Sequence, residues 1–319
     1  MLLAFAGGAG WLAWYATRPL PLTVLPQQFS VIPGSSLNGI AIQLSKAGII
    51  DHPLAFRILG RLLGKSSTIQ AGVYTIEVPL TAVQLYRKML RGEVTQAAIR
   101  FIEGWNIREV RAALAADPSL RHDSRDMNET ALLAAIGARE DKLEGMLFPD
   151  TYFFSPGSSD IDLVRRAYRK QQAKLAQAWG TRASGLPYKS PYEALIMASI
   201  IEKETGAPEE RPLVAAVFLN RLRIGMRLQT DPTVIYGLGD KFDGNLHKID
   251  LEHDTAYNTY TRYGLPPSPI AMPGEASLQA ALNPAISNAL YFVATGNGTH
   301  VFSENLAQHN KAVDRYQRQ

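Results

Sequence analysis

The chain has 319 residues, of which 46% are hydrophobic and 19% charged, a composition that excludes general disorder and allows two or three domains. It contains no cysteine, which excludes disulfides, thiol catalysis and thiolate zinc sites. The net charge is +4 and the basic residues are dispersed, so we expect no nucleic-acid partner. This weak positive charge suits an anionic cell-surface polymer or a membrane face.

The N-terminal segment predicts a membrane anchor. Residues 1–17 carry no charge, and two tryptophans and a tyrosine precede Arg18 at the expected interface. A spanning helix needs about 20 apolar residues and basic residues ahead of it, so we expect the true start codon to lie upstream. The alternative is a signal peptide cleaved near Ala16. Both interpretations place the remainder outside the cytoplasm, after a stiff Pro-rich linker at 18–26.

Residues 27–95 predict a small α+β module. A short strand begins near Phe29, and a Pro-Gly turn then leads into an amphipathic helix that ends at Gly48. The pattern continues with a helix, a strand and a helix at 54–63, 71–78 and 81–90. Strand, helix, helix, strand and helix within so short a segment make a compact module.

Residues 96–319 predict a larger mixed α+β domain. The strand patterns lie at 99–102, 288–294 and 300–303, and the helix patterns at 107–115, 129–136, 160–179, 190–206, 209–224 and 304–316. The aromatic stretch 143–154 is expected to line the core as loop or strand. Two stretches rich in Gly, Pro, Asn, Thr and Tyr, 226–240 and 256–274, are expected to form loops suited to a polysaccharide groove.

The segment 190–206 predicts one capped helix. Ser190 is a suitable N-cap, and Glu193 three residues later completes a capping box. Pro191 suits the first helical position, and Gly206 ends the helix. The last turn of this helix therefore carries two glutamates.

Only one of these glutamates suits catalysis. Glu202 and Glu204 point about 200° apart on a helix, so they cannot share one cleft. The preceding turns place Ile200, Ile201 and Met197 beneath Glu204. Desolvation and the negative end of the helix dipole would both raise the pKa of Glu204, which predicts a general acid. The alternative is that both glutamates are solvated.

A second catalytic carboxyl is less evident. Asp231 in QTDPT is the nearest candidate, although Asp before Pro is also a common turn starter. One acid is enough if a sugar hydroxyl attacks its own anomeric carbon, because the same glutamate can protonate the leaving oxygen and then deprotonate the hydroxyl. The six histidines lack a metal-ligand spacing, and no nucleophile elbow or phosphate-binding loop occurs. We expect neither a metal nor a cofactor.

Several long motifs resemble the YceG-like family, the endolytic murein transglycosylases. They occur in the family's order and cover nearly all of the chain after the anchor: VIPGSSLNGIAIQL (31–44), EGMLFPDTY (144–152), ASIIEKETG (198–206), Glu210-Arg211, VFLNRLRIGMRLQTDPTVIYG (217–237), AYNTYTRYGLPPSPIAMPG (256–274) and YFVATGNGTHVFSENLAQHN (291–310). The first of these motifs is similar to the LysM-like module of that family.

The resemblance implies an enzyme of the inner membrane, with a single-pass anchor and its catalytic domain in the periplasm. It implies cleavage within nascent peptidoglycan strands, which leaves 1,6-anhydro-N-acetylmuramic acid ends and terminates strand elongation near peptidoglycan synthases. The family's catalytic residue is the second glutamate of the E-K-E triplet, here Glu204. By the same resemblance the expected substrate-binding residues are Gln229, Asp231, Asn258, Thr259 and Tyr260.

Two other functions remain open at this point. A non-catalytic scaffold protein would bind peptidoglycan through the LysM-like module and the aromatic loops without forming a product. A muramidase would use water in place of the internal hydroxyl. The anhydro product lacks one water, so the mass of the product separates the two enzymes.

Overall fold

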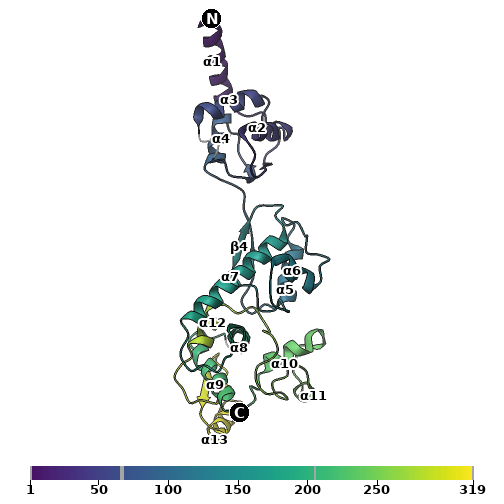
Figure 1. Cartoon of the computed structure of the whole chain (residues 1–319), viewed down its shortest axis with the longest axis vertical. Coiled ribbons are helices and arrows are strands. Elements are labelled where there is room, and N and C mark those ends of the chain that lie inside the picture. The colour runs from purple at the N-terminus through teal and green to yellow at the C-terminus, as the bar shows by residue number, and fades with distance from the viewer. Residues whose placement is uncertain (1, 65–67, 205, 318–319) are drawn as a thin grey trace. The chain divides into compact units, whose positions relative to one another are not determined.

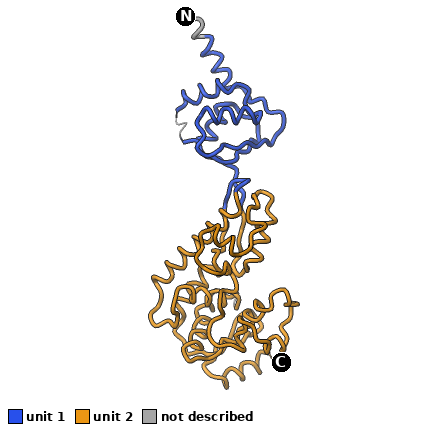
Figure 2. The backbone as a smooth tube through the Cα atoms, turned by 45° about the vertical axis from the view of Figure 1, so that its right-hand side comes forward, with its two compact units in different colours: residues 1–98, 153–158 blue, residues 99–152, 159–319 orange. Residues whose placement is uncertain are grey.

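The computed structural model describes residues 2–64, 68–204 and 206–317 (Figure 1). Its contacts divide the chain into two compact units, residues 1–98 with 153–158 and residues 99–152 with 159–319 (Figure 2). The sequence places the boundary after residue 95, whereas the structure divides the chain after residue 98 and returns a short segment to the first unit. Both units combine helices with small antiparallel sheets, so the predicted α+β class is confirmed.

The first unit has the predicted order of strand, helix, helix, strand and helix. Its described elements are α1 (Leu2–Thr17), β1 (Gln27–Val31), α2 (Leu37–Lys46), α3 (Pro53–Leu63), β2 (Gly72–Ile76) and α4 (Ala82–Leu90). The strands β1 and β2 are antiparallel with Phe29 opposite Tyr74, and the two rings stack with centroids 5.3 Å apart. A Thr81 capping box begins α4. Alternating apolar positions thus fix the register over one shared core.

Residues 18–26 pack on the first unit, which corrects the expectation of a stiff linker. The backbone N–H of Leu20 donates to the Leu80 carbonyl at 2.9 Å, and the Leu20 side chain is buried. Leu22 and Leu25 also pack against this core. The leucines between the prolines explain the difference, because burying apolar side chains outweighs the tendency of a Pro-rich chain to extend.

The helix α1 has 16 residues, and its last turn packs on the same unit through Tyr15 and Ala16. Among the residues that the structure describes, none of the helices has both the length and the apolar character needed to cross a membrane.

The second unit is built around α8. Its described elements are β3 (Ala97–Arg100) and β4 (Thr151–Phe154), through which the boundary between the units passes, α5 (Ile107–Ala116), α6 (Glu129–Ile136), α7 (Asp160–Gly180), α8 (Pro191–Glu204), α9 (Arg211–Arg223), α10 (Asp231–Leu238), α11 (Lys248–Glu252), α12 (Glu275–Leu282), β5 (Tyr291–Ala294), β6 (His300–Ser303) and α13 (Leu306–Tyr316). The helices α7, α9, α10 and α12 surround α8. Every residue from Ala194 to Ile201 is therefore buried, and α8 is a rigid support for the groups at its end.

The loops of the second unit are tied to α8 and to one another. Ser199 on α8 donates its hydroxyl to the Ile196 carbonyl and accepts from the Ile270 N–H at 3.0 Å. Gly145 has φ +75°, and a Cβ atom there would lie 2.3 Å from Pro269 Cβ, so only glycine allows this approach. The stretch 143–154 lines the core through buried side chains such as Leu147 and Phe148, as expected.

One predicted loop contains a helix. The stretch 226–240 forms α10, which begins at Asp231 with Pro232 in its first turn. Proline is favoured in the first turn because its missing N–H has no intrahelical partner there. Asp231 therefore begins a helix and does not start the isolated turn considered above.

Candidate active site

The end of α8 places Glu202 and Glu204 in different surroundings. The helix begins as predicted, with the Ser190 hydroxyl accepting from the Glu193 N–H at 3.4 Å. The Glu193 carboxylate accepts from the backbone N–H of Lys189 and not from that of Ser190, so the predicted capping box is incomplete. Thr205 lies outside the described residues, and the described part of the helix ends at Glu204.

Glu202 is held by groups that compensate its charge. Its side chain is only 6% exposed, and its carboxylate lies 3.5 Å from the Arg211 guanidinium. It also accepts from the Gly274 N–H at 2.9 Å. These contacts join α8, the start of α9 and the start of α12. The alternative of two solvated glutamates is therefore excluded, because Glu202 itself is buried in an ion pair.

Glu204 faces a cavity with much weaker compensation. Its Oε1 accepts from the buried hydroxyl of Thr230. Burial raises the pKa of Glu204, and the charge of Asp231 raises this pKa further. The Thr230 hydrogen bond and the nearby His300 and Arg221 oppose the increase. The net direction is upward, so this carboxyl keeps its proton to a higher pH than an ordinary glutamate.

The cavity beside Glu204 has a volume of about 510 Å³. It is formed by the ends of α8, α9 and α10, by the hairpin β5–β6 and by α13. The lining residues come from six segments of the chain: Glu204, Arg221, Gln229, Asp231, Tyr260, Tyr291, Phe292, Val293, Ala294, His300, Leu306, His309, Val313 and Gln317. Carboxyl, amide, phenol and imidazole groups alternate with apolar surface, a mixture that suits a sugar with polar edges and apolar faces.

Three of the five predicted substrate-binding residues lie in this lining. Gln229, Asp231 and Tyr260 share the cavity with Glu204. The Tyr260 hydroxyl donates to Asp231 Oδ1 at 2.5 Å. Gln229 has φ +50°, a left-handed conformation that is uncommon for residues other than glycine. Such strain persists where surrounding contacts fix the backbone, and the Gln229 N–H donates to the Thr259 carbonyl at 3.2 Å.

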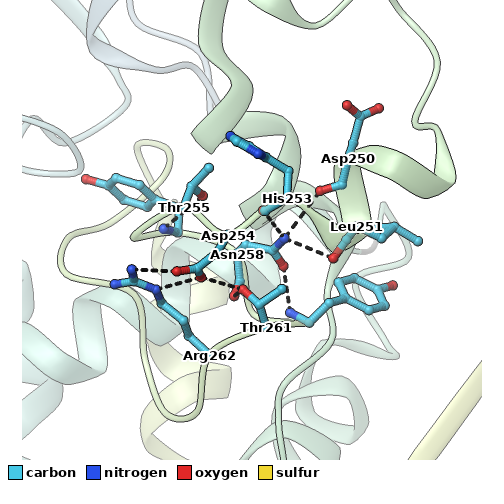
Figure 3. A network of polar contacts seen from close by, with 10 residues as sticks. Asp250, Leu251, His253, Asp254, Thr255, Asn258, Thr261 and Arg262 are labelled. Atoms are coloured by element: carbon cyan, nitrogen blue, oxygen red, sulfur yellow. Dashed lines mark hydrogen bonds and ion pairs between the residues drawn. The ribbon is translucent and has the colours of Figure 1, made fainter.

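Asn258 and Thr259, the other two predicted residues, are buried behind the lining. The Asn258 amide donates to the carbonyls of Asp250, Leu251 and His253, and its oxygen accepts from the Tyr260 N–H at 2.8 Å (Figure 3). These bonds occupy the Asn258 side chain within the protein. They hold the loop that carries Tyr260.

Thr259 links this loop to the segment that contacts Glu204. Its hydroxyl accepts from the Thr230 N–H at 3.0 Å and lies 2.9 Å from the Thr233 hydroxyl. Thr259 therefore fixes the position of Thr230, which in turn bonds to Glu204. Asn258 and Thr259 are thus buried residues that hold lining residues in place and are not part of the lining themselves.

Sequence reasoning did not single out several cavity residues. Thr230, Arg221, Tyr291 and His300 line the cavity or touch Glu204. Each lies within a motif on which the family resemblance is based, so the motifs contained the signal but did not rank their members. The His300 ring is hydrogen-bonded to the Glu210 carboxylate.

The sequence that forms this site matches a known protein family. Residues 29–315 match the model of the YceG-like family, and the chain belongs to that family.

The relatives carry a consistent name. The chain is 33% identical over 300 residues to the endolytic murein transglycosylase of Bacillus subtilis, an alignment covering 89% of this chain and 82% of the relative. It is 26% identical over 355 residues to the endolytic murein transglycosylase of Streptococcus pneumoniae, and this alignment covers 98% of the chain but 63% of the relative. A crystal structure of a YceG-like protein from Listeria monocytogenes matches with a TM-score of 0.57 and 30% identity, covering 89% of this chain and 97% of that one.

Proposed function

We propose that this protein is a lytic transglycosylase that cuts within peptidoglycan glycan strands. It cleaves the β-1,4 bond between N-acetylmuramic acid and N-acetylglucosamine and leaves 1,6-anhydro ends. The observation that carries the proposal is the buried carboxyl of Glu204, with its raised pKa, in the lining of a cavity of about 510 Å³. The names of the Bacillus subtilis and Streptococcus pneumoniae relatives support the substrate and the reaction.

The reaction needs one carboxyl group in two successive roles. The protonated Glu204 gives its proton to the glycosidic oxygen, the bond from this oxygen to C1 of the muramic acid breaks, and the N-acetylglucosamine leaves with a free hydroxyl. The Glu204 carboxylate then takes the proton of the C6 hydroxyl, whose oxygen bonds to the same C1. Glu204 is protonated again, and no water is consumed.

The surroundings of Glu204 fit both roles. Its raised pKa keeps the proton available for the first step. In the second step the Thr230 hydroxyl hydrogen-bonds to the carboxylate that has formed. The charge of Asp231 favours the oxocarbenium-like transition state electrostatically. Gln229 and Tyr260, from the same lining, are the side chains that we assign to substrate positioning.

The proposal extends to the cellular setting predicted from the sequence. The chain would be held in the inner membrane by its N-terminal helix, with the catalytic unit in the periplasm and a LysM-like module between them. There it would end the growth of nascent glycan strands close to the peptidoglycan synthases. Supporting this setting are the uncharged residues 1–17, with aromatic residues ahead of Arg18, and the strand and helix order of the first unit.

Mass spectrometry of digested glycan strands tests the reaction. Purified protein is incubated with strands stripped of stem peptides and, in parallel, with intact peptidoglycan, while a muramidase provides hydrated reference fragments. The proposal expects internal fragments whose muramic acid end lacks one water relative to the reference. Fragments with hydrated ends would show a hydrolase. Binding by folded protein without any fragments would show the scaffold protein instead.

A further inference from the structure

A second buried carboxylate holds a histidine at the edge of the same cavity. Glu210, the residue before α9, is 8% exposed. Its Oε1 accepts from the His300 backbone N–H at 2.8 Å, and its Oε2 lies 2.6 Å from His300 Nδ1. The two residues are ninety positions apart in the chain. One carboxylate therefore fixes both the backbone and the ring of the first residue of β6.

The ring of His300 is also held by packing. The Phe292 ring on β5 meets it edge to face with centroids 5.4 Å apart, and the Phe302 ring packs beside both, with its centroid 6.4 Å from that of the imidazole. The imidazole side chain is only 15% exposed. A ring with two aromatic neighbours and a carboxylate partner has one preferred orientation.

This orientation leaves one nitrogen for the cavity. The Glu210 carboxylate accepts a hydrogen bond from Nδ1–H, so Nε2 is the remaining polar atom of the ring. His300 lines the cavity together with Glu204. In the part of the chain that the structure describes, Nε2 has no hydrogen-bond partner. A polar atom without a partner at a cavity wall gains a hydrogen bond when a ligand supplies one.

We propose that Glu210 and His300 form a substrate-binding pair, in which Nε2 of His300 hydrogen-bonds to a sugar hydroxyl of the glycan. The inference rests on the proposed function and adds a residue that orients the sugar relative to Glu204. A hydroxyl group both donates and accepts, so the contact forms with a neutral or a charged ring. Glu210 acts through His300 and is a positioning residue.

Two substitutions of His300 separate this role from a purely structural one. In His300→Asn the side-chain amide lies near the place of Nδ1, so the contact with Glu210 is kept and the cavity nitrogen is lost. In His300→Gln the amide reaches the place of Nε2. We expect the first variant to melt like the wild type and to lose roughly tenfold in kcat/KM for anhydro-fragment release, with partial recovery in the second. If the pair were purely structural, His300→Gln would lose more kcat/KM than His300→Asn, because only the asparagine keeps the contact with Glu210.

His247→Asn is the matched control. The side chain of His247 is 59% exposed and lies outside the cavity lining. This variant should keep the wild-type kcat and KM. A folded His300→Asn variant with the same parameters as the control would overturn the proposal.

An NMR measurement detects the contact between His300 Nε2 and the sugar without turnover. Glu204→Gln protein labelled with ¹⁵N in its histidines is titrated with a peptidoglycan tetrasaccharide of alternating N-acetylglucosamine and N-acetylmuramic acid. The His300 Nε2 resonance should move on binding, while Nδ1 stays near its position. Saturable binding without movement of Nε2 would refute the pair. If the wild type releases no anhydro fragments, the proposed function fails, whereas the nitrogen shift still decides on the pair.

Discussion

The two sides of the end of α8 show how one helix can carry a structural and a reactive carboxyl. On one side Glu202 has a cation, Arg211, and a backbone N–H donor from Gly274. On the other side Glu204 has one hydroxyl donor, a cavity and the negative charge of Asp231. Both carboxyls are withdrawn from solvent, so burial alone does not distinguish them. The compensating groups differ, and those around Glu204 are too weak to offset burial, so its pKa is raised.

The substitution with the largest expected effect is Glu204→Gln, which removes the ionisable proton of this carboxyl. Glu204→Gln should lower release of anhydro fragments by roughly 10² to 10⁴-fold, because general acid–base catalysis contributes about that much. The melting temperature should stay close to that of the wild type, since the cavity accommodates an amide. Product release followed by mass spectrometry, with circular dichroism for the fold, checks both statements. Wild-type activity in this variant would remove Glu204 from the mechanism.

Glu202→Gln is the matched substitution on the other side. It leaves the largely buried Arg211 guanidinium without its partner, which should lower the free energy of unfolding by on the order of 3 kcal/mol. The activity per folded molecule should remain within a few-fold of the wild type. Urea unfolding and kcat measured below the transition give the two values. A Glu202 variant that is stable but inactive would reverse the assignment of the two glutamates.

A third buried carboxyl, Glu144, sharpens the comparison because it has several donors and does not line the cavity beside Glu204. It accepts from the Ile107 N–H and the Tyr236 hydroxyl. Burial nevertheless raises the pKa of Glu144 to about 7. The folded state therefore binds this proton more tightly than the unfolded chain, so stability is greatest below the ordinary pKa of 4.5 and falls as the pH rises to about 7.

The change in stability from Glu144 should amount to roughly 3 kcal/mol over this pH range. In Glu144→Gln this part of the pH dependence should disappear, while anhydro-fragment release persists. Chemical unfolding at pH 4.5, 5.5, 6.5 and 7.5 measures the difference between the two proteins. If the free energy of unfolding changes with pH in the same way in the variant and the wild type, Glu144 does not have the raised pKa.

Substitution of Asn258 tests the difference between a residue behind the lining and one within it. Asn258→Ala leaves three partly buried carbonyls without their donor and should cost about 2 kcal/mol of stability. A direct substrate contact would instead raise KM and leave the melting temperature unchanged. Calorimetry together with steady-state kinetics separates the two outcomes.

The smallest expected effect concerns Tyr260. Tyr260→Phe removes the hydroxyl that donates to Asp231 but keeps the aromatic ring in the cavity. We expect a roughly fivefold loss in kcat/KM, the size of one hydrogen bond of about 1 kcal/mol. Tyr263→Phe, at an exposed ring outside the cavity lining, is the control and should have no effect.

The sequence predicted those features that depend on local pattern. Helix periodicity gave the bounds of α8 to within a few residues, and the apolar turn beneath Glu204 gave the correct direction for its pKa. The alternation at 71–78 and the apolar pattern near Phe29 gave the two strands of the first unit, while their pairing is seen in the structure. In each case the deciding contacts lie within one or two turns of helix or along one strand.

What the sequence did not predict depends on contacts between distant segments. Glu202 is buried because Arg211 and Gly274 meet it, and neither contact follows from helical spacing. The hydrogen bond between Glu210 and His300 joins the residue before α9 to the first residue of β6, and only the fold brings these two positions together. The packing of residues 18–26 on the first unit likewise depends on a surface that local composition does not describe.

The central claim is that the Glu204 carboxyl keeps its proton above the range of an ordinary glutamate. Its pKa can be measured by following the side-chain carboxyl carbon of ¹³C-labelled glutamate by NMR from pH 3 to 8, with Glu204→Gln assigning the resonance. We predict a midpoint above 4.5, and a lower midpoint in Asp231→Asn, since the charge of Asp231 raises this pKa. A Glu204 midpoint at or below 4.5 would contradict the account.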